Sequence, residues 1–260
     1  MKPYGYTELL EDVLKLTALY SEKVSVEIIG KSVKGRLLPL IKSGKGKRKL
    51  LMVGAVHGRE FVSAAFLMRS VGELLSEAEI SHASLYVVPM LNPDGVETAL
   101  LKGSELFKNN ANNVNLNANF PFFFEKVPKS RQGGGFAASE PETKALIRLC
   151  EKERFSSALA LHARGNCIFW RDEGNKEILG DFELAKRFEK ECGFELISST
   201  KKAEDYSGGF ENWFRCRYKR PALCVELVKD EEISFSDMCQ NFEDAVIWSK
   251  TKNLLKTYIN

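Results

Sequence analysis

His57 and Glu60 are the first residues of this chain whose types and spacing could hold a metal ion. They lie three positions apart in residues 53–60, VGAVHGRE, where a short apolar run ends in a turn. An imidazole and a carboxylate with this spacing on a strand-to-helix turn can both reach one zinc ion, which then needs a third ligand from elsewhere. Because acidic residues are frequent in the chain, the pair alone is a weak signal, and a third ligand has to be sought.

His162 is the candidate for that third ligand. It follows the strand-like run at residues 157–161, just as His57 follows an apolar run of its own. An isolated histidine is most often a hydrogen-bonded or solvated side chain, and His82, in a polar turn, is interpreted in that way. Two histidines at the carboxyl ends of two apolar strands, 105 residues apart, favour a shared site, because ligands gather beyond the strand ends of such sheets.

Glu226 lies within the apolar run PALCVELV at residues 221–228. One interpretation places this glutamate on the solvent-facing side of an edge strand. In the chemical interpretation, Glu226 is a general base. Its carboxylate would lie in apolar surroundings, beside a water molecule that a metal ion activates. The apolar run by itself is compatible with both.

The elements that must position these residues alternate between strand patterns and helix patterns. A first helix follows Thr7, with an apolar stripe at Leu10, Val13 and Leu14, and residues 92–95, NPDG, form a turn. Further predicted strands are residues 24–29, 36–42, 50–56, 84–90 and 157–161, and further predicted helices are residues 61–75, 181–192 and 234–258. This rhythm predicts one α/β domain, residues 1–260, with a mixed, mostly parallel sheet flanked by helices.

The composition of the chain indicates which binding partners and which cellular compartment to expect. The net charge of the 260 residues is +3, with 28% charged residues of both signs, which predicts no nucleic-acid partner. Charged residues interrupt the first twenty positions, so we expect neither a secretory signal nor a membrane partner. The six cysteines form no C-x-x-C pair, which is typical of free thiols in a reducing compartment. The expected location is the cytoplasm.

Asparagine dominates residues 109–119, where it occupies seven of the eleven positions. Composition alone is typical of a polar, low-complexity loop. However, Val114, Leu116 and Phe120 are spaced to anchor the segment, and asparagine tolerates left-handed backbone while offering donors and acceptors. We therefore favour a buried polar loop that lines a site.

Taken together, the motifs of this chain resemble those of the zinc carboxypeptidase (carboxypeptidase A) superfamily. The matching motifs, in order, are H-x-x-E at 57–60, N-P-D-G at 92–95, N-V-N-L-N-A-N-F at 113–120, S-E-P-E-T at 139–143, L-H at 161–162, S-G-G-x-x-x-W at 207–213 and V-E-L at 225–227. They extend over nearly the whole chain. Residues 30–36, GKSVKGR, and 162–170, HARGNCIFW, most resemble the bacterial γ-D-glutamyl-diaminopimelate peptidases that cut cell-wall peptides.

The resemblance implies that His57, Glu60 and His162 hold one zinc ion and leave an open position for water. It implies that Glu226 takes the proton of the attacking water and passes it to the leaving amine. Relatives place an arginine against the oxygen of the scissile carbonyl, and a gapless count puts Lys108 at that position. A lysine lacks the bidentate fork of arginine, and a solvated surface lysine is the alternative for this residue.

Two departures from the family pattern concern the substrate. Relatives follow the loop asparagine, here Asn117, with an arginine that grips the C-terminal carboxylate of a peptide, but this chain has Ala118. The relatives' mobile tyrosine falls on Glu204, so Tyr206 could replace it only if the loop shifts by two residues.

Two charged residues could recognise the substrate's side chain. Glu211 falls where relatives keep the residue that sets side-chain preference, and a carboxylate there would favour an amine. Arg164, two residues after a predicted zinc ligand, could hold a carboxylate, and diaminopimelate carries both groups. For both residues, a surface charge on a helix or a loop is the alternative.

The sequence therefore predicts a zinc peptidase that hydrolyses the amide bond between γ-D-glutamate and a diamino acid in small cell-wall (murein) peptides. Diaminopimelate and lysine both fit the diamino acid, and both internal and terminal cleavage agree with the motifs. The alternatives are a general metallocarboxypeptidase, a zinc amidohydrolase that deacylates N-acyl amino acids, and a peptide-binding module that has lost turnover. The absence of arginine at Lys108 and Ala118 motivates the last of these.

Overall fold

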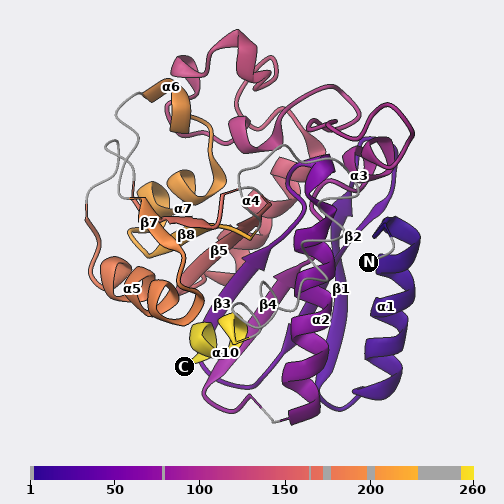
Figure 1. Ribbon diagram of the computed structural model, residues 1–260, viewed down its shortest axis with the longest axis vertical. Helices are drawn as coiled ribbons and strands as arrows, with labels where there is room; N and C mark the ends of the chain where they lie inside the picture. Colours follow the sequence, from indigo (N-terminus) through magenta and orange to yellow (C-terminus); the bar gives the residue numbers. More distant parts are fainter. Residues whose placement is uncertain (1–2, 78–79, 164, 172–176, 198–202, 228–252) are drawn as a thin grey trace.

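The computed structural model describes residues 3–77, 80–163, 165–171, 177–197, 203–227 and 253–260 (Figure 1). Within these ranges the chain forms one α/β domain built on a single sheet, as the sequence predicts. None of the helices in these ranges has both the length and the apolar character needed to cross a membrane. The five cysteines in the described ranges are free thiols, and Cys239 lies outside them.

The described strands form one eight-stranded sheet in the order β1-β2-β4-β3-β5-β8-β6-β7. The strands are β1 Val24–Lys31, β2 Leu37–Ser43, β3 Arg48–Val53, β4 Ala83–Val88, β5 Ser157–His162, β6 Cys167–Phe169, β7 Glu195–Ile197 and β8 Ala222–Glu226. The four central strands β4, β3, β5 and β8 are parallel, whereas β2 and β6 run antiparallel to their central neighbours. The prediction of a mixed, mostly parallel sheet is confirmed.

Helices cover both faces of the sheet. The α-helices are α1 Tyr6–Leu19, α2 Phe61–Glu77, α3 Pro93–Ala99, α4 Pro141–Glu153, α5 Asp181–Cys192, α6 Ala203–Tyr206, α7 Phe210–Tyr218 and α10 Leu254–Ile259. Helices α1, α2, α5 and α10 share one hydrophobic cluster with one face of the sheet, and α4 and α7 share a second cluster with the other face. The segment from about residue 100 to residue 140 crosses the upper end of the molecule in Figure 1.

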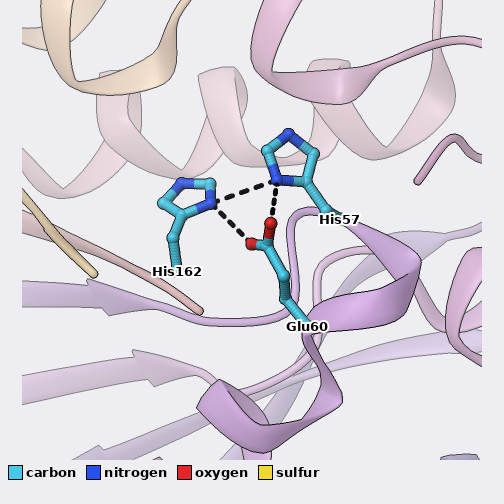
Figure 2. Close-up of side chains that lie close together, drawn as sticks. All are labelled: His57, Glu60 and His162. Atoms are coloured by element: carbon cyan, nitrogen blue, oxygen red, sulfur yellow. Dashed lines mark hydrogen bonds and ion pairs between the residues drawn. The ribbon is translucent and has the colours of Figure 1, made fainter. Parts of the chain in front are cut away.

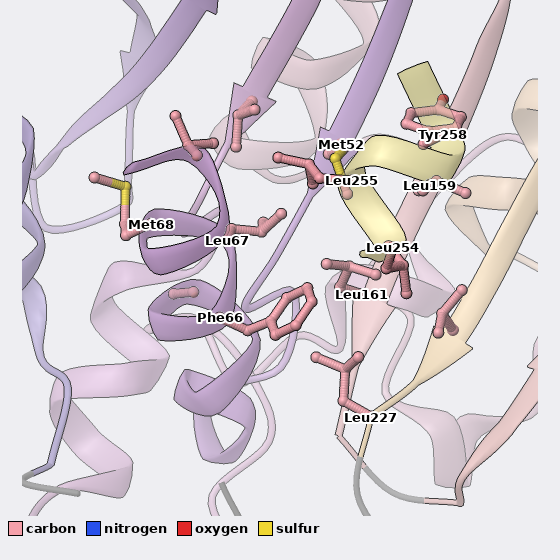
Figure 3. Packing of buried hydrophobic residues seen from close by; sticks show 14 of the residues in the cluster. Met52, Phe66, Leu67, Met68, Leu159, Leu161, Leu227, Leu254, Leu255 and Tyr258 are labelled. Carbon is pink, nitrogen blue, oxygen red and sulfur yellow. The ribbon is translucent and has the colours of Figure 1, made fainter. Parts of the chain in front are cut away.

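Alternation along β5 shows how the strands separate the two clusters. Leu159 and Leu161 point into the first cluster, where Figure 3 shows them near side chains of α2 and α10. Ala158 and Ala160 point to the other face, where their small size leaves room for the aromatic side chains of α7. His162 continues the alanine series, so its side chain lies on that second face at the carboxyl end of the strand.

The register of the central strands brings the predicted site residues together. His162 of β5 is the direct partner of Glu226 of β8, and the backbone N–H of Leu227 donates to the carbonyl of His162 at 2.9 Å. Strand β8 lies between β5 and β6, so the interpretation of Glu226 as a residue on an edge strand is wrong. Because the two strands are parallel, their last residues meet at the same edge of the sheet.

Three local predictions need correction or fall outside the described residues. Residues 92–95 begin helix α3, because the Asn92 side chain caps it by accepting the N–H of Gly95 at 2.9 Å and Pro93 fits its first turn. In α1, Val13 is buried as predicted, but its buried neighbours are Leu9 and Leu16, whereas Leu10 and Leu14 are exposed. Most of the helix predicted at residues 234–258 lies outside the described ranges, which include only α10.

The glycines of the HGRE and NPDG motifs allow two backbone segments to meet. A Cβ atom at Gly58 would lie 2.3 Å from the carbonyl oxygen of Gly95, and a Cβ atom at Gly95 would lie 2.4 Å from that of Asn109. The Asn92 amide donates to the carbonyls of Val56 and Asn109, at 3.2 and 3.1 Å. The turn that carries His57 is therefore fixed directly against α3 and the asparagine-rich loop.

Candidate active site

His57, Glu60 and His162 converge beyond the ends of β3 and β5, and Figure 2 shows both rings turned toward the carboxylate. The Nδ1 atoms of His57 and His162 lie 2.7 and 2.8 Å from the two carboxylate oxygens of Glu60 and 3.2 Å from each other. All three side chains are buried. The structure thus brings together, from positions 105 residues apart, the three ligands that the sequence predicts.

The proton on His57 is positioned by Asn115, which the sequence analysis did not identify. The Oδ1 atom of Asn115 accepts the backbone N–H of Asn117 at 3.0 Å, which identifies this atom as the oxygen of the amide, and it lies 3.1 Å from Nε2 of His57. The Nε2 atom of a neutral His57 must then carry the proton, so Nδ1 presents a lone pair. That lone pair faces the carboxylate of Glu60, an arrangement that a cation between them would stabilise.

Burial and mutual interaction determine the charges of these three groups. Burial lowers the pKa of His57 to about 4, so this ring is neutral near neutral pH. Burial would raise the pKa of Glu60, but His57 and His162 outweigh this effect and hold it well below its usual value. Burial would likewise lower the pKa of His162, but the Glu60 carboxylate, with Glu226 and Glu211, raises it to about 9. The carboxylate is therefore ionised, as a metal ligand must be.

The donor set fits a single zinc ion. Ligand atoms of a tetrahedral zinc site lie about 3.3 Å apart, because zinc binds nitrogen and carboxylate oxygen at about 2.0–2.2 Å. The contacts in this triad are 2.7 to 3.2 Å long, and two imidazoles with one carboxylate form a common set for catalytic zinc. Zinc bound by three protein ligands supplies Lewis acidity and lowers the pKa of water to about 7.

We expect Asn115→Ala to weaken zinc binding about 10- to 100-fold, because the hydrogen bond that fixes the His57 ring is lost. Asn115→Asp keeps an acceptor and should bind zinc at least as well as the parent protein. The measurement is competition for zinc against a chromophoric chelator. Asn119→Ala is the control: Asn119 lies in the same loop but bonds to Gly133 and Ser139, so it should lower thermal stability without changing zinc affinity. Parent-like zinc affinity in Asn115→Ala would contradict the assignment.

Glu226 lies in the same site. It faces His162 across β5 and β8, and its charge acts on the pKa of His162 and that of Lys108. The Cys224 thiol lies 3.9 Å from Oε1 of Glu226. The structure therefore places the predicted general base next to the metal ligands, on a central strand.

Lys108 is half-buried and lies next to the segment that carries His57, and its role at the scissile carbonyl stays a prediction. Its carbonyl oxygen accepts the N–H of Gly58, the residue after His57, at 3.0 Å. Burial lowers the pKa of the Lys108 side chain; the nearby Arg59 and Arg131 add to this effect, whereas Glu60 and Glu226 oppose it. Lys108 is thus a half-buried cation within electrostatic reach of a zinc ligand and of the predicted base.

The lowered pKa of Lys108 leads to a pH prediction. A lysine with a lowered pKa loses its charge at a lower pH than an exposed lysine, so activity that needs this charge is present below that pKa and is lost as the pH rises through it. Arginine stays charged throughout, so Lys108→Arg should move the alkaline limit of activity to higher pH. The measurement is kcat/KM as a function of pH. Identical alkaline limbs in the two proteins would exclude Lys108 as the group responsible.

The asparagine-rich loop is ordered by its own side chains, as predicted. Asn109, Asn110, Asn115 and Asn119 are buried. The Asn110 amide, for example, donates to Glu140 at 2.7 Å and to Glu142 at 3.2 Å. Each side chain accepts or donates within the loop or to the segment that precedes α4, which compensates for its burial. The loop is held by these hydrogen bonds beside the metal ligands, rather than lying in solvent as a low-complexity segment.

Two of the predicted substrate-binding residues lie near the metal ligands. Asn117 accepts the backbone N–H of Phe210 on its Oδ1 atom at 2.8 Å, and it is joined to Asn115 through its own N–H. Glu211 is the second residue of α7, and its charge acts on the pKa values of His162 and Cys224. Glu211 is half-buried on this helix, within electrostatic reach of a metal ligand. Whether either residue binds substrate stays a prediction.

The remaining two substrate-binding predictions have different outcomes. Tyr206 ends α6 and is buried in the second hydrophobic cluster, with its ring 6.2 Å from that of Phe122. A role for its hydroxyl in binding substrate stays a prediction. Arg164 lies outside the described residues.

The sequence analysis also missed two cations, Arg59 and Arg131. Arg59 lies between two metal ligands in the HGRE segment, so its position in the sequence could have revealed it. Arg131 lies in a basic, glycine-rich stretch that looks like an ordinary surface loop, and no local pattern identifies it.

A sheet of this topology with two imidazoles, one carboxylate and an adjacent glutamate at its carboxyl edge defines a zinc hydrolase. The family model described as zinc carboxypeptidase matches residues 10–235. The chain belongs to the zinc carboxypeptidase family, and His57, Glu60 and His162 form its metal-binding triad.

Individual proteins resemble this chain in sequence or in fold. The chain is 28% identical over 264 residues to γ-D-glutamyl-L-diamino acid endopeptidase 1 of Lysinibacillus sphaericus, with 86% of this chain and 65% of that protein covered. The chain thus spans somewhat less than two thirds of that relative. Among solved structures, bovine thrombin-activatable fibrinolysis inhibitor superposes with a TM-score of 0.79 at 18% identity, covering 98% of both chains. Murein-tripeptide amidase MpaA of Escherichia coli O157 superposes with a TM-score of 0.60 at 23% identity, covering 89% of this chain and 92% of that one.

Proposed function

We propose that this zinc peptidase hydrolyses the amide bond between γ-D-glutamate and a diamino acid in cell-wall peptides. The motifs shared with γ-D-glutamyl-diaminopimelate peptidases and the name of the Lysinibacillus relative support this substrate. The partner in this proposal is a small murein peptide. The proposal also places the protein in the cytoplasm, where such peptides would arrive by uptake, and the free thiols of the described cysteines are compatible with that compartment.

The observation that carries the proposal is the half-buried carboxylate of Glu211, whose charge reaches a metal ligand. Its charge acts on His162 and Cys224, while Arg59, Lys108 and Arg131 form a cationic group. A diamino acid carries an additional amine, which a carboxylate can bind, and at least one carboxylate, which a cation can bind. The site therefore offers opposite charges to the two kinds of group on such a substrate.

The residues of the chain can be assigned roles in this hydrolysis. Glu226 accepts the proton of the attacking water and donates it to the amine that leaves. Lys108 stabilises the negative charge that develops on the oxygen of the scissile carbonyl, from a half-buried position where such an interaction is stronger than in open solvent. Asn117 lines the same wall and orients the substrate.

The test uses the zinc-loaded protein and L-Ala-γ-D-Glu-L-diaminopimelate, with release of diaminopimelate as the measurement. A second substrate pair examines Glu211: L-Ala-γ-D-Glu-L-lysine and the norleucine analogue, which lacks the side-chain amine. We expect the parent to prefer the lysine peptide and Glu211→Gln to lose most of that preference, while cleavage of the norleucine peptide changes little.

Three other outcomes would overturn the proposal in favour of a named alternative. Brisk trimming of ordinary peptides without cleavage of the γ-glutamyl peptide would indicate a general metallocarboxypeptidase. Cleavage of N-acyl amino acids alone would indicate a deacylase. Tight binding of the peptide without cleavage, with or without zinc, would indicate a binding module.

A further inference from the structure

Arg131 joins the asparagine-rich loop to the glycine turn at residues 207–209. It ends the short 3₁₀-helix η4, Lys129–Arg131, and is half-buried. Its Nη1 atom donates to the carbonyl of Ser207 and its Nη2 atom donates to the carbonyl of Asn117, both at 2.9 Å. A planar guanidinium held at two of its nitrogens has a fixed orientation.

The loop that carries Arg131 lies directly on Ala118, the position at which relatives have an arginine. Ala118 is fully buried, and a Cβ atom at Gly133, two residues after Arg131, would lie 2.6 Å from the carbonyl oxygen of Ala118. A Cβ atom at Gly208 would lie 2.3 Å from the same oxygen. The backbone of residue 118 is thus enclosed by the two segments that Arg131 connects.

Arg131 is linked to the segment that precedes Glu211 and, through its charge, to Lys108. The backbone carbonyl of Asn117 accepts from Nη2 of Arg131. The side-chain Oδ1 of Asn117 accepts the N–H of Phe210, the residue before Glu211. The charge of Arg131 also acts on the half-buried side chain of Lys108. The acceptors at Ser207 and Asn117 are backbone carbonyl oxygens, which orient the guanidinium between the two segments.

We propose that Arg131 binds the free carboxylate of the amino acid on the leaving side of the scissile bond, replacing from another loop the arginine that is absent at Ala118. This inference rests on the proposed function and narrows its substrate. The diamino acid would bind with its amine near Glu211 and its carboxylate at Arg131. The protein would then release a C-terminal diamino acid, and peptides extended or amidated at that carboxylate would be poor substrates.

The test compares L-Ala-γ-D-Glu-L-lysine with its C-terminal carboxamide, using the zinc-loaded full chain. We expect the parent to favour the free carboxylate by at least about tenfold in kcat/KM, because a charge-assisted, bidentate contact is lost in the amide. Arg131→Gln should lower kcat/KM for the free carboxylate about 10- to 100-fold, mainly through KM, and leave the carboxamide within about twofold. Arg131→Lys should restore part of the difference, because it keeps the charge.

Lys129→Gln is the matched control, since Lys129 is an exposed cation of the same 3₁₀-helix and should affect neither substrate. If Arg131→Gln slows both substrates equally, Arg131 only fastens the loop and the inference is wrong. It is also wrong if the parent cleaves both peptides equally well, although the proposed function would then stand.

Binding to a catalytically inactive background makes the test independent of turnover. Affinities of the two peptides are measured by calorimetry with zinc-loaded Glu226→Gln and with Glu226→Gln/Arg131→Gln. Tighter binding of the free carboxylate that disappears with Arg131 supports the inference, and equal affinities overturn it. If the γ-glutamyl peptides fail and ordinary peptides are cleaved, the proposed function is wrong, and the same comparison with benzoyl-glycyl-lysine and its amide decides the role of Arg131.

Discussion

Glu226→Gln should keep zinc near one ion per chain and lose turnover by about 100- to 10,000-fold, because the general base is removed while all three ligands remain. The substitution replaces one carboxylate oxygen by an amide nitrogen of similar size, so the packing around β8 changes little. Glu226 faces His162 across two central strands but is not one of the three metal ligands. The measurements are kcat for release of the amine product and zinc content by elemental analysis of the same preparation.

Glu211→Gln is the matched control for this experiment, because it neutralises a second carboxylate of the same site. It should act mainly on KM and on the preference for a side-chain amine, with a much smaller effect on kcat. A Glu226→Gln protein that keeps activity within a few fold of the parent would remove Glu226 from the mechanism. Loss of zinc in that variant would show that Glu226 supports the metal and would leave the identity of the base open.

The parts of the site that were predicted from the sequence are those carried by regular strands. His57 and His162 each follow an apolar run, and parallel strands bring such positions to one edge whatever the separation along the chain. The limits of α5 were predicted to the residue, at Asp181 and Cys192, because its periodic pattern is bounded by glycines at 180 and 193. Strand order and register decide whether such residues touch, and these follow from packing of the whole domain.

The parts that could not be predicted depend on contacts between loops. Arg131 belongs to a segment with the composition of a solvated loop, and only the folded backbone shows that it bonds to Asn117 and Ser207. Asn115 is one of seven asparagines in its tract, and its hydrogen bond to His57 distinguishes it from the others. Residues 92–95 have the composition of a turn, but the same asparagine and proline cap a helix once a further turn of helix follows.

His162→Ala should lose zinc, because a direct ligand is removed. Its zinc affinity should fall by more than the roughly 10- to 100-fold expected when only a hydrogen bond that supports a ligand is lost. Two ligands, His57 and Glu60, would remain on one short segment. The buried Glu60 carboxylate would also lose the partner at 2.8 Å that helps to hold its pKa well below the usual value. Zinc that binds the folded state adds to stability by mass action, so zinc should raise the melting temperature of the parent and not that of the variant.

His82→Ala provides the matched control, because His82 is the third histidine of the chain and is exposed. It should keep both the zinc content and the zinc-dependent rise in melting temperature. Elemental analysis after dialysis against equal free zinc, together with thermal unfolding with and without a chelator, measures both properties. If His162→Ala retained a full complement of zinc, the ion would have to be held without the residue that joins β5 to the metal triad. The shared register of His162 and Glu226 would then no longer explain how the chain positions its general base beside the metal.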